Sequence, residues 1–431
     1  MTFVIILKIV LFLEVLIMCG AVKNYININK TIKNTKIYRY GEEDANFSIF
    51  LPCHKEYNLI EETLLYFNNF TKSHNTSVFV IVATELESNG KKVKEDSYTR
   101  CLDFIKNNNL SIKVIFDETI SSTKTSKLSF ALNSINKIPK KTYIGVYDFD
   151  ARPHKNTINW IANDICYRKG DMPTVYQQIP YVIQNVNTKT PKVIDLLSIW
   201  HIRRSLGIEG YNFFSKKSKK DIFYLMGSGM YIRVDELLNV GGFPDYSDDI
   251  ALGYRFYLLN KKQVIIPYPA IVSGLNNLKD YFNQITRIYY GIFSIREQYK
   301  YLTLNGIKVT KTNYFMKFIY SIFDVTREVI LLVSLLLSVY ITKSIIALII
   351  CLTLLLLKYL VYNILFNKIK YDWIENSNKY NWNRKIVHIL KNTLIGFTLN
   401  IPFRTLALLN FILKKGSLES KFFLSSNKEK I

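Results

Sequence analysis

The stretch Tyr143-Ile144-Gly145-Val146-Tyr147-Asp148-Phe149-Asp150 joins a short apolar run to two carboxylates. The run is typical of a buried strand, in which alternate residues face the same way, so Asp148 and Asp150 would share one side. Ligands of an open α/β sheet bind at the carboxyl ends of its strands. Two carboxylates there suit a hard divalent cation that carries a diphosphate, and an aspartate-rich turn is the alternative.

The region around this stretch alternates between two periodicities. Short runs rich in β-formers are separated by segments of helical period, such as the helix expected over 59–69. This alternation predicts βαβ units and an α/β fold whose helices cover the sheet. The expected strands are 47–51, 78–83, 112–115, 143–147 and 174–179.

A second acidic pair, Asp248-Asp249, follows Ser247 and precedes a helical stretch over 250–259. Serine is a good N-cap and acids favour the first turn of a helix, so a purely structural role is one interpretation. The surrounding sequence favours a functional one. It contains Gly227-Ser228-Gly229-Met230, Val240-Gly241-Gly242-Phe243 and Asp249-x-x-x-Gly253-x-Arg255.

Taken in order, these pieces resemble the membrane-bound inverting glycosyltransferases of family 2 over roughly 46–300. Lys55 stands where that family has Asn, Ile288 stands where it has Trp, and Glu85 is the nearest candidate for its first acidic residue. The matching segments are Leu51-Pro52-Cys53-His54-Lys55-Glu56, Lys127 with Ala131-Leu132-Asn133, Asp148 to Asp150, Asp248-Asp249, and Gln284-Ile285-Thr286-Arg287-Ile288.

The resemblance implies a GT-A fold, the Rossmann-like fold of nucleotide-diphospho-sugar transferases, and it implies roles for the matching residues. Asp249, beside Asp248, would be the general base, and Asp148 with Asp150 would hold Mg²⁺ or Mn²⁺. The donor, with a UDP-sugar as first choice, would meet Pro52, Glu56, Glu85, Lys127, Asp148, Gln284 and Arg287. The acceptor would meet Gly227, Ser228, Gly229, Ile288 and Tyr289.

The last segment also has a physical interpretation of its own. A helix over 279–299 would carry an apolar stripe, while Gln284 and Arg287, three residues apart, share another face. The stripe would rest on a bilayer and the polar face would point at the site, or the stripe would simply face the core. Its members are Tyr281, Ile285, Ile288, Tyr289 and Ile292.

Both ends of the chain carry long apolar runs. Residues 3–22 are long enough to cross a bilayer, and we expect an anchor here in preference to a cleaved signal peptide. Residues 329–366 fit two helices joined at 342–344. Because lysines and an arginine follow the first run and no side-chain cation precedes it, the following domain is expected in the cytoplasm.

A third apolar segment, 386–413, is flanked by basic residues on both sides and contains Pro402. We expect an interfacial or re-entrant element, with a third span as the alternative. The predicted organisation is an anchor (1–23), a linker (24–45), the GT-A domain (46–300), a membrane hairpin region (301–366), and an interfacial segment with a basic tail (367–431). The expected protein is an integral membrane protein, in the plasma membrane if the source is bacterial.

Composition limits the alternatives. Subtracting 34 acidic from 57 basic residues gives +23, but no helix-turn-helix, RNP-like or zinc-spaced pattern supports nucleic acid as a partner. The five cysteines lack paired spacing, which suggests a reducing compartment. The sequence therefore predicts transfer from a nucleotide-diphosphate sugar to a lipid-linked or glycan acceptor in cell-surface glycan synthesis. A processive polysaccharide synthase is the alternative, and a non-enzymatic basic membrane or nucleic-acid-binding protein is the alternative of another class.

Overall fold

The computed structural model describes residues 46–183, 224–342 and 401–414, with short gaps at 73–74, 88–91, 94–95, 121–122, 136–141, 169, 246 and 276. Scattered positions in 5–26, 349–364 and 390–399 are described as well. Most of the predicted anchor, the linker, the second half of the hairpin and the basic tail therefore lie outside the described residues.

Within these residues the strands form one mixed sheet in the order β3-β2-β1-β4-β7-β6-β8-β5. β1 to β4 pair in parallel, whereas β7 runs antiparallel between β4 and β6. The strands are β1 (Phe47–Cys53), β2 (Thr76–Thr84), β3 (Ile112–Ile120), β4 (Tyr143–Val146), β5 (Arg152–Pro153), β6 (Val175–Ile183), β7 (Met230–Arg233) and β8 (Gln263–Ser273).

All five predicted strands are present, which confirms the α/β prediction. The sequence did not reveal β7, which has four residues, or β8, which contains Pro267 and Pro269. Proline disfavours a strand interior, but these two lie where the β6–β8 register shifts between Gln178 and Pro180.

Helices cover both faces of the sheet, as expected. In β1, Ile49 and Leu51 belong to the apolar cluster that contains residues of α2, α3 and α5, while Phe50 belongs to the cluster of α4, α8 and α9. The parallel strands read as continuous apolar runs because both of their faces are buried. The helices are α2 (Ile60–Phe70), α3 (Ser97–Asn107), α4 (Lys124–Ser134), α5 (Thr157–Tyr167), α8 (Val234–Asn239) and α9 (Ile250–Leu258), and Tyr57–Leu59 forms a 3₁₀ turn.

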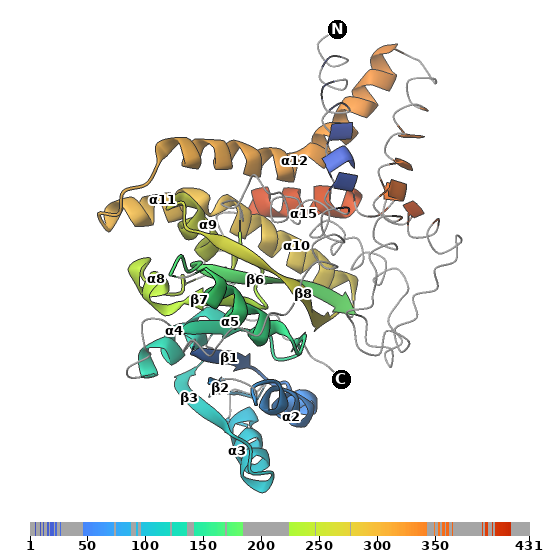
Figure 1. Ribbon diagram of the computed structural model, residues 1–431. Coiled ribbons are helices and arrows are strands. Elements are labelled where there is room, and N and C mark those ends of the chain that lie inside the picture. The colour runs from blue at the N-terminus through green and yellow to red at the C-terminus, as the bar shows by residue number, and fades with distance from the viewer. Residues whose placement is uncertain are drawn as a thin grey trace.

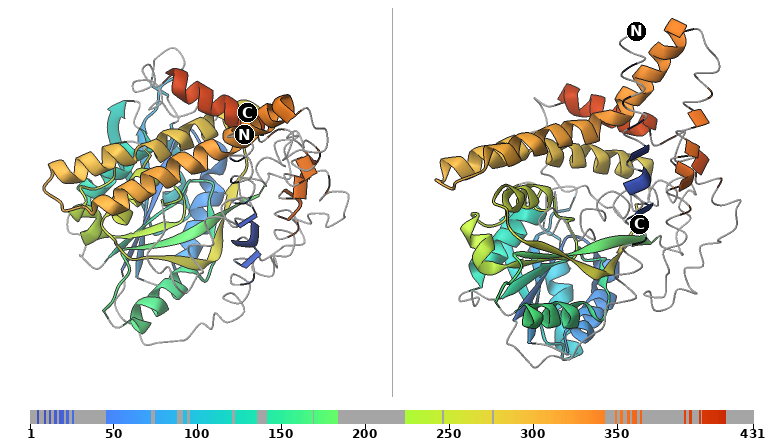
Figure 2. Two further views of the ribbon diagram at one scale, coloured as in Figure 1. Left: turned by 90° about the horizontal axis from the view of Figure 1, so that it is seen from above. Right: turned by 45° about the horizontal axis from the view of Figure 1, so that its top comes forward.

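A separate group of helices lies beyond α9 on one side of the sheet (Figure 1). It contains α10 (Leu278–Phe293), α11 (Ile295–Leu304), α12 (Lys311–Thr342) and α15 (Ile401–Lys414). Seen from above, α10 and α12 run beside each other with α15 next to them (Figure 2). The expected single helix over 279–299 is wrong, because the chain breaks at Ser294, whose hydroxyl donates to the Gly291 carbonyl at 2.6 Å.

The apolar stripe of α10 faces protein. Tyr281, Ile285, Tyr289 and Ile292 are buried against Ala407, Leu408 and Phe411 of α15. The bilayer contact expected for this stripe is therefore wrong, and the core-facing alternative holds because α15 covers it. Pro402, expected to break its segment, instead lies within α15, as the second residue of its described range.

The described part of α12 runs from Lys311, earlier than the predicted apolar run, to Thr342. The turn predicted at 342–344 falls on residues that, after Thr342, lie outside the described ones. Across the part of the chain that the structure describes, no helix is both long and apolar enough to cross a membrane.

One glycine fixes the approach of α9 to the chain before β7. A Cβ on Gly253 would lie 2.4 Å from the backbone nitrogen of Leu225 and 2.6 Å from the Cα of Tyr224. The acidic pair at the start of α9 is thereby held next to the Gly227-Ser228-Gly229 segment.

We predict that Gly253→Ala lowers the free energy of unfolding by about 1–3 kcal/mol, the usual cost of overpacking. Alanine normally stabilises a helix relative to glycine. A decrease in the free energy of unfolding would therefore indicate the close contact between α9 and the chain before β7. Chemical denaturation of the purified protein measures the change. An unchanged or raised stability would show that α9 does not pack this closely.

Candidate active site

The two carboxylates after β4 lie in a turn and have different partners. β4 ends at Val146, and the Ala151 amide donates to the Asp148 carbonyl at 2.8 Å. Asp148 Oδ1 accepts from Lys124 Nζ, whereas Asp150 Oδ2 accepts from the Ser273 amide at 3.1 Å. The alternation expected for a strand therefore does not apply here, because the strand ends before the pair begins.

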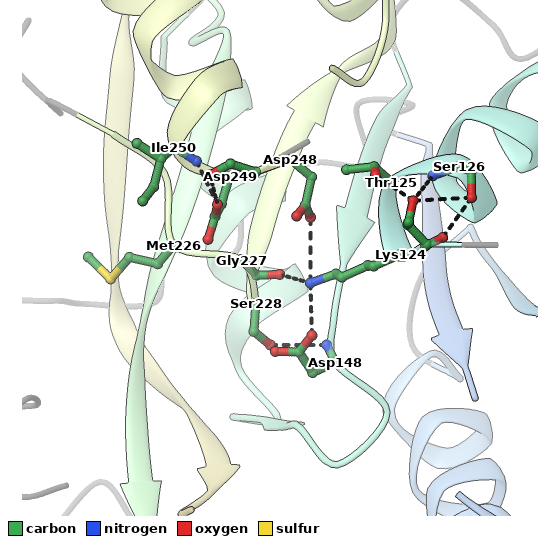
Figure 3. Close-up of polar contacts among 12 residues, drawn as sticks. Lys124, Thr125, Ser126, Asp148, Met226, Gly227, Ser228, Asp248, Asp249 and Ile250 are labelled. Atoms are coloured by element: carbon green, nitrogen blue, oxygen red, sulfur yellow. Dashed lines mark hydrogen bonds and ion pairs between the residues drawn. The ribbon is translucent and has the colours of Figure 1, made fainter. Parts of the chain in front are cut away.

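Lys124, the first residue of α4, is the cation at the centre of this site (Figure 3). Its ammonium lies 2.8 Å from Asp148 Oδ1, 2.6 Å from the Gly227 carbonyl and 3.5 Å from Asp248 Oδ2. Burial disfavours the charge, but the carboxylates of Asp148 and Asp248 outweigh it and raise the lysine pKa. Three chain segments thus meet at one ammonium group.

Asp248 is buried, and its Oδ2 has no hydrogen-bond partner among the described residues. Its pKa is raised to about 6, chiefly by burial and also by the negative charges of Asp249 and Asp148, while Lys124 and Arg287 oppose the shift. A buried carboxylate without a hydrogen-bond donor is costly, so this oxygen is suited to meet a cation or proton.

Asp249 caps α9 with one oxygen and presents the other to the site. Its Oδ1 accepts from the Ile250 amide at 2.7 Å and from the Ser247 hydroxyl at 3.2 Å. The capping interpretation of this pair therefore applies to Asp249 itself rather than to Ser247. Its Oδ2 lies toward Gly227, where a Cβ would come within 2.9 Å of it.

The segment Gly227-Ser228-Gly229 forms the wall of the site. Ser228 Oγ accepts from the Asp148 amide at 3.2 Å, and Gly229 has a φ of +76°, which favours glycine. Gln177 holds the segment from behind, because its amide group donates to the carbonyls of Met226 and Ser228 and its oxygen accepts from the Met226 amide.

Lys127 lies apart from this cluster. It is buried, and its ammonium donates to the Cys53 carbonyl at 2.6 Å, at the end of β1. Burial lowers the pKa of Lys127, although nearby acidic groups, including Glu85 and Glu56, act to raise it. The structure therefore gives Lys127 a partner in the loop after β1 rather than a place beside Asp148.

Glu85, at the end of β2, organises the same loop. Its oxygens accept from the Lys55 amide and the Tyr57 hydroxyl, both at 2.7 Å, and from the hydroxyl and amide of Ser97. Burial would raise its pKa, but these bonds outweigh it and lower the value. These bonds hold Lys55 at a φ of +53° and so shape the turn from Pro52 to Glu56. The side chain of Glu56 is half-buried.

The residues predicted on α10 divide between two environments. Arg287 is exposed, yet close enough to Asp248 to lower its pKa, and Gln284 is half-buried. Tyr289 is 1% exposed and its hydroxyl donates to the Arg404 carbonyl, while Ile288 packs beside Tyr254 and Ile250. Gly291 lets α10 approach, since a Cβ there would lie 2.7 Å from Ser247 Oγ.

No cluster of three or more histidine, cysteine or acidic side chains suited to a metal is present among the described residues. Asp148, Asp248 and the Gly227 carbonyl do surround one position with oxygens, the donors that Mg²⁺ and Mn²⁺ prefer. The donor set therefore fits a divalent cation at the position that the Lys124 ammonium takes.

Lys124 is the site residue that sequence reasoning missed. The sequence did contain a signal for it. Thr123 is a good N-cap, which places Lys124 in the first turn of a helix. The helix dipole disfavours a positive charge there, so a lysine in this position suggests a nearby anion.

Comparison with known sequences gives one family. The sequence model described as glycosyl transferase family group 2 matches residues 143–362. A search of curated protein sequences gave no match.

Among solved structures, the first of the two below agrees with this chain at the level of the fold. A mannosyltransferase from Pyrobaculum calidifontis, solved with GDP-Man and Mn²⁺, is 11% identical and superposes with a TM-score of 0.55 over 95% of this chain and 99% of its own. A glucosyl-3-phosphoglycerate synthase from Mycobacterium tuberculosis, solved with Mn²⁺, UDP and glucosyl-3-phosphoglycerate, is 13% identical, with a TM-score of 0.35 over 59% of this chain and 85% of its own.

His54, in the loop after β1, gives a test of this geometry by pH. Burial, and then the positive charge of Lys127, lowers its pKa to about 4. The unfolded chain binds this proton more tightly, so the stability contributed by neutral His54 is full above about pH 6.5 and is lost as the pH falls toward 4. We predict a shallower loss of melting temperature over this range in His54→Gln, measured by calorimetry. Parallel curves for the two proteins would contradict the half-buried placement of His54 beside Lys127.

Proposed function

The chain belongs to glycosyl transferase family group 2, and from this premise we propose that it transfers a sugar, with inversion, from a nucleotide-diphosphate donor to a membrane-associated acceptor. The chain is a glycosyltransferase; the donor, the acceptor and the membrane context are the proposal. The observation that carries it is the meeting of Asp148, Asp248 and Asp249 around Lys124 and Gly227.

Asp249 is assigned as the general base. Its Oδ1 is held by α9 and its Oδ2 faces Gly227, so one oxygen is positioned and the other is available to accept a proton. The acceptor hydroxyl gives its proton to Oδ2 as its oxygen bonds to the sugar C1. The bond from C1 to the diphosphate oxygen breaks, and the nucleoside diphosphate leaves with that electron pair. A single displacement of this kind inverts the anomeric centre.

The departing diphosphate needs positive charge. Arg287 is exposed near Asp248, and Lys124 lies at the same edge, so both are suited to contact phosphate oxygens. Lys127 and Glu85 are engaged with the loop after β1, and we assign them to shaping the nucleotide pocket together with Pro52 and Glu56.

A divalent ion, Mg²⁺ or Mn²⁺, would neutralise the leaving group when bound, and Asp148 is its first proposed ligand. Asp150, the partner expected from the sequence, is bonded to the Ser273 amide through one oxygen. The mannosyltransferase that shares the fold was solved with Mn²⁺ and GDP-Man, which supports a metal and a nucleotide sugar here without choosing between GDP and UDP donors.

The membrane context rests on the apolar runs 3–22 and 329–366 and on exposed apolar side chains of the helical group. On α12, Phe315, Met316, Ile319 and Ile322 share one exposed face. An acceptor that is lipid-linked, and a catalytic domain in the cytoplasm where nucleotide sugars are supplied, fit this arrangement.

A short product is proposed over a long polymer. The resemblance implies that processive members stack the acceptor sugar on a Trp at the position of Ile288, and tyrosine could replace it only if exposed. Tyr289 is buried against α15, so α10 offers no flat face here. A polysaccharide synthase remains the alternative outcome of product analysis.

The proposal is tested by incubating the purified chain with a panel of nucleotide sugars and membrane extract, followed by mass spectrometry of the products. Addition of one or a few sugar masses to a lipid-extractable acceptor is expected. A high-molecular-weight polymer made by this chain alone would select the synthase alternative, and no transfer from any nucleotide sugar would contradict the proposal.

We predict that Asp249→Asn lowers the transfer rate by at least about 10²-fold while donor binding is retained, because a general base contributes about 10²- to 10⁴-fold. Asp245→Asn, on an exposed aspartate of the same loop, is the matched control and keeps the wild-type rate. Turnover of Asp249→Asn within threefold of wild type would end the assignment.

A further inference from the structure

We propose that the ammonium group of Lys124 occupies the divalent-cation position of the site in the donor-free protein, so that Lys124 and the metal ion compete for the same three oxygens. The oxygens are Asp148 Oδ1, Asp248 Oδ2 and the Gly227 carbonyl. This site pairs Asp148 with the acidic pair of α9 rather than with Asp150.

The distances show why both cations cannot be present. The ammonium is within hydrogen-bond distance of Asp148 Oδ1 and the Gly227 carbonyl, at 2.8 and 2.6 Å. A divalent ion bound to the same oxygens would lie within a few ångströms of the ammonium, where two positive charges repel strongly. Lys124 must therefore leave before the ion enters.

The buried oxygen of Asp248 points to the same conclusion. Asp248 is 9% exposed, and its Oδ2 lies 3.5 Å from the ammonium without a hydrogen bond. The lysine therefore satisfies Asp148 and Gly227 well but Asp248 poorly. A divalent ion has no such geometric restriction, because it binds oxygens from several directions at once.

Lys124 also has a route out of the site. Its side chain is 28% exposed, and it stands on the first turn of α4, so rotation of its four-carbon stem moves the charge toward solvent. A donor diphosphate at this edge would give the displaced ammonium a new anionic partner. The metal ion and the diphosphate should therefore bind cooperatively, each strengthening the other by the same factor.

The catalytic meaning of this exchange rests on the proposed function, but the competition itself does not. The test measures Mn²⁺ binding to the full-length protein, without substrate and without turnover, by the loss of the free-ion electron paramagnetic resonance signal. The probes are Mn²⁺ alone and Mn²⁺ with UDP or GDP. Failure of transfer would thus leave the binding result intact, and failure of competition would leave the transferase assignment intact.

Lys124→Met should bind Mn²⁺ alone at least tenfold more tightly than wild type. It should also show a smaller increase in affinity when a nucleoside diphosphate is added. Lys106→Met, on an exposed lysine of α3, makes the same change in net charge and should match wild type. Equal or weaker Mn²⁺ binding by Lys124→Met, or an equal gain in Lys106→Met, would overturn the proposal.

The double variant Lys124→Met/Asp148→Asn locates the ion. It should lose the gain seen in Lys124→Met, because one of the three oxygens is then neutral. Retention of the gain would place the ion elsewhere and would also overturn the proposal. Folding is followed by circular dichroism, and if Lys124→Met does not fold, Lys124→Gln, which keeps a polar group near Asp148, takes its place under the same criteria.

Discussion

The ion pairs of Lys124 with Asp148 and Asp248 hold the site together. The two carboxylates come from the turn after β4 and from the loop before α9, and without a cation between them they would repel. Asp248 is the buried member of the three, and the nearby ammonium offsets part of the cost of burying its charge. The same carboxylates that bind the Lys124 ammonium in the donor-free protein are therefore suited to bind a metal ion that enters with the donor diphosphate.

The uncharged parts of the structure position these charges. Gly253 lets α9 approach the chain before β7, and Gly291 lets α10 approach the start of α9, where the pair Asp248-Asp249 lies. Gln177 fixes the carbonyls behind Gly227, and Glu85 fixes the loop after β1. Each of these residues makes several hydrogen bonds or close contacts, and together they position the backbone at this edge of the sheet.

The sequence predicted the fold well because strand burial and helix period are local properties. All five expected strands and the start of α9 were correct, while β8 was missed because its two prolines sit at a register shift that only its partner β6 defines. The structure brings together three acidic residues that the sequence singled out, Asp148, Asp248 and Asp249, but it does not pair Asp148 with Asp150. Asp150 turns to Ser273 and Asp248 turns to Lys124, and such partners are set by tertiary contacts between distant segments. The apolar face of α10 was misread for the same reason, since α15, more than a hundred residues later, covers it.

The central claim is that the edge formed by β1, β4 and the start of α9 binds the donor diphosphate. An experimental structure of the full chain with Mn²⁺ and a nucleoside diphosphate tests it most directly. The account predicts the diphosphate at the carboxyl ends of β1 and β4, with the ion in contact with Asp148 and with Asp249 facing the open side of the pocket. A nucleotide bound away from Asp148 and Asp248 would contradict it.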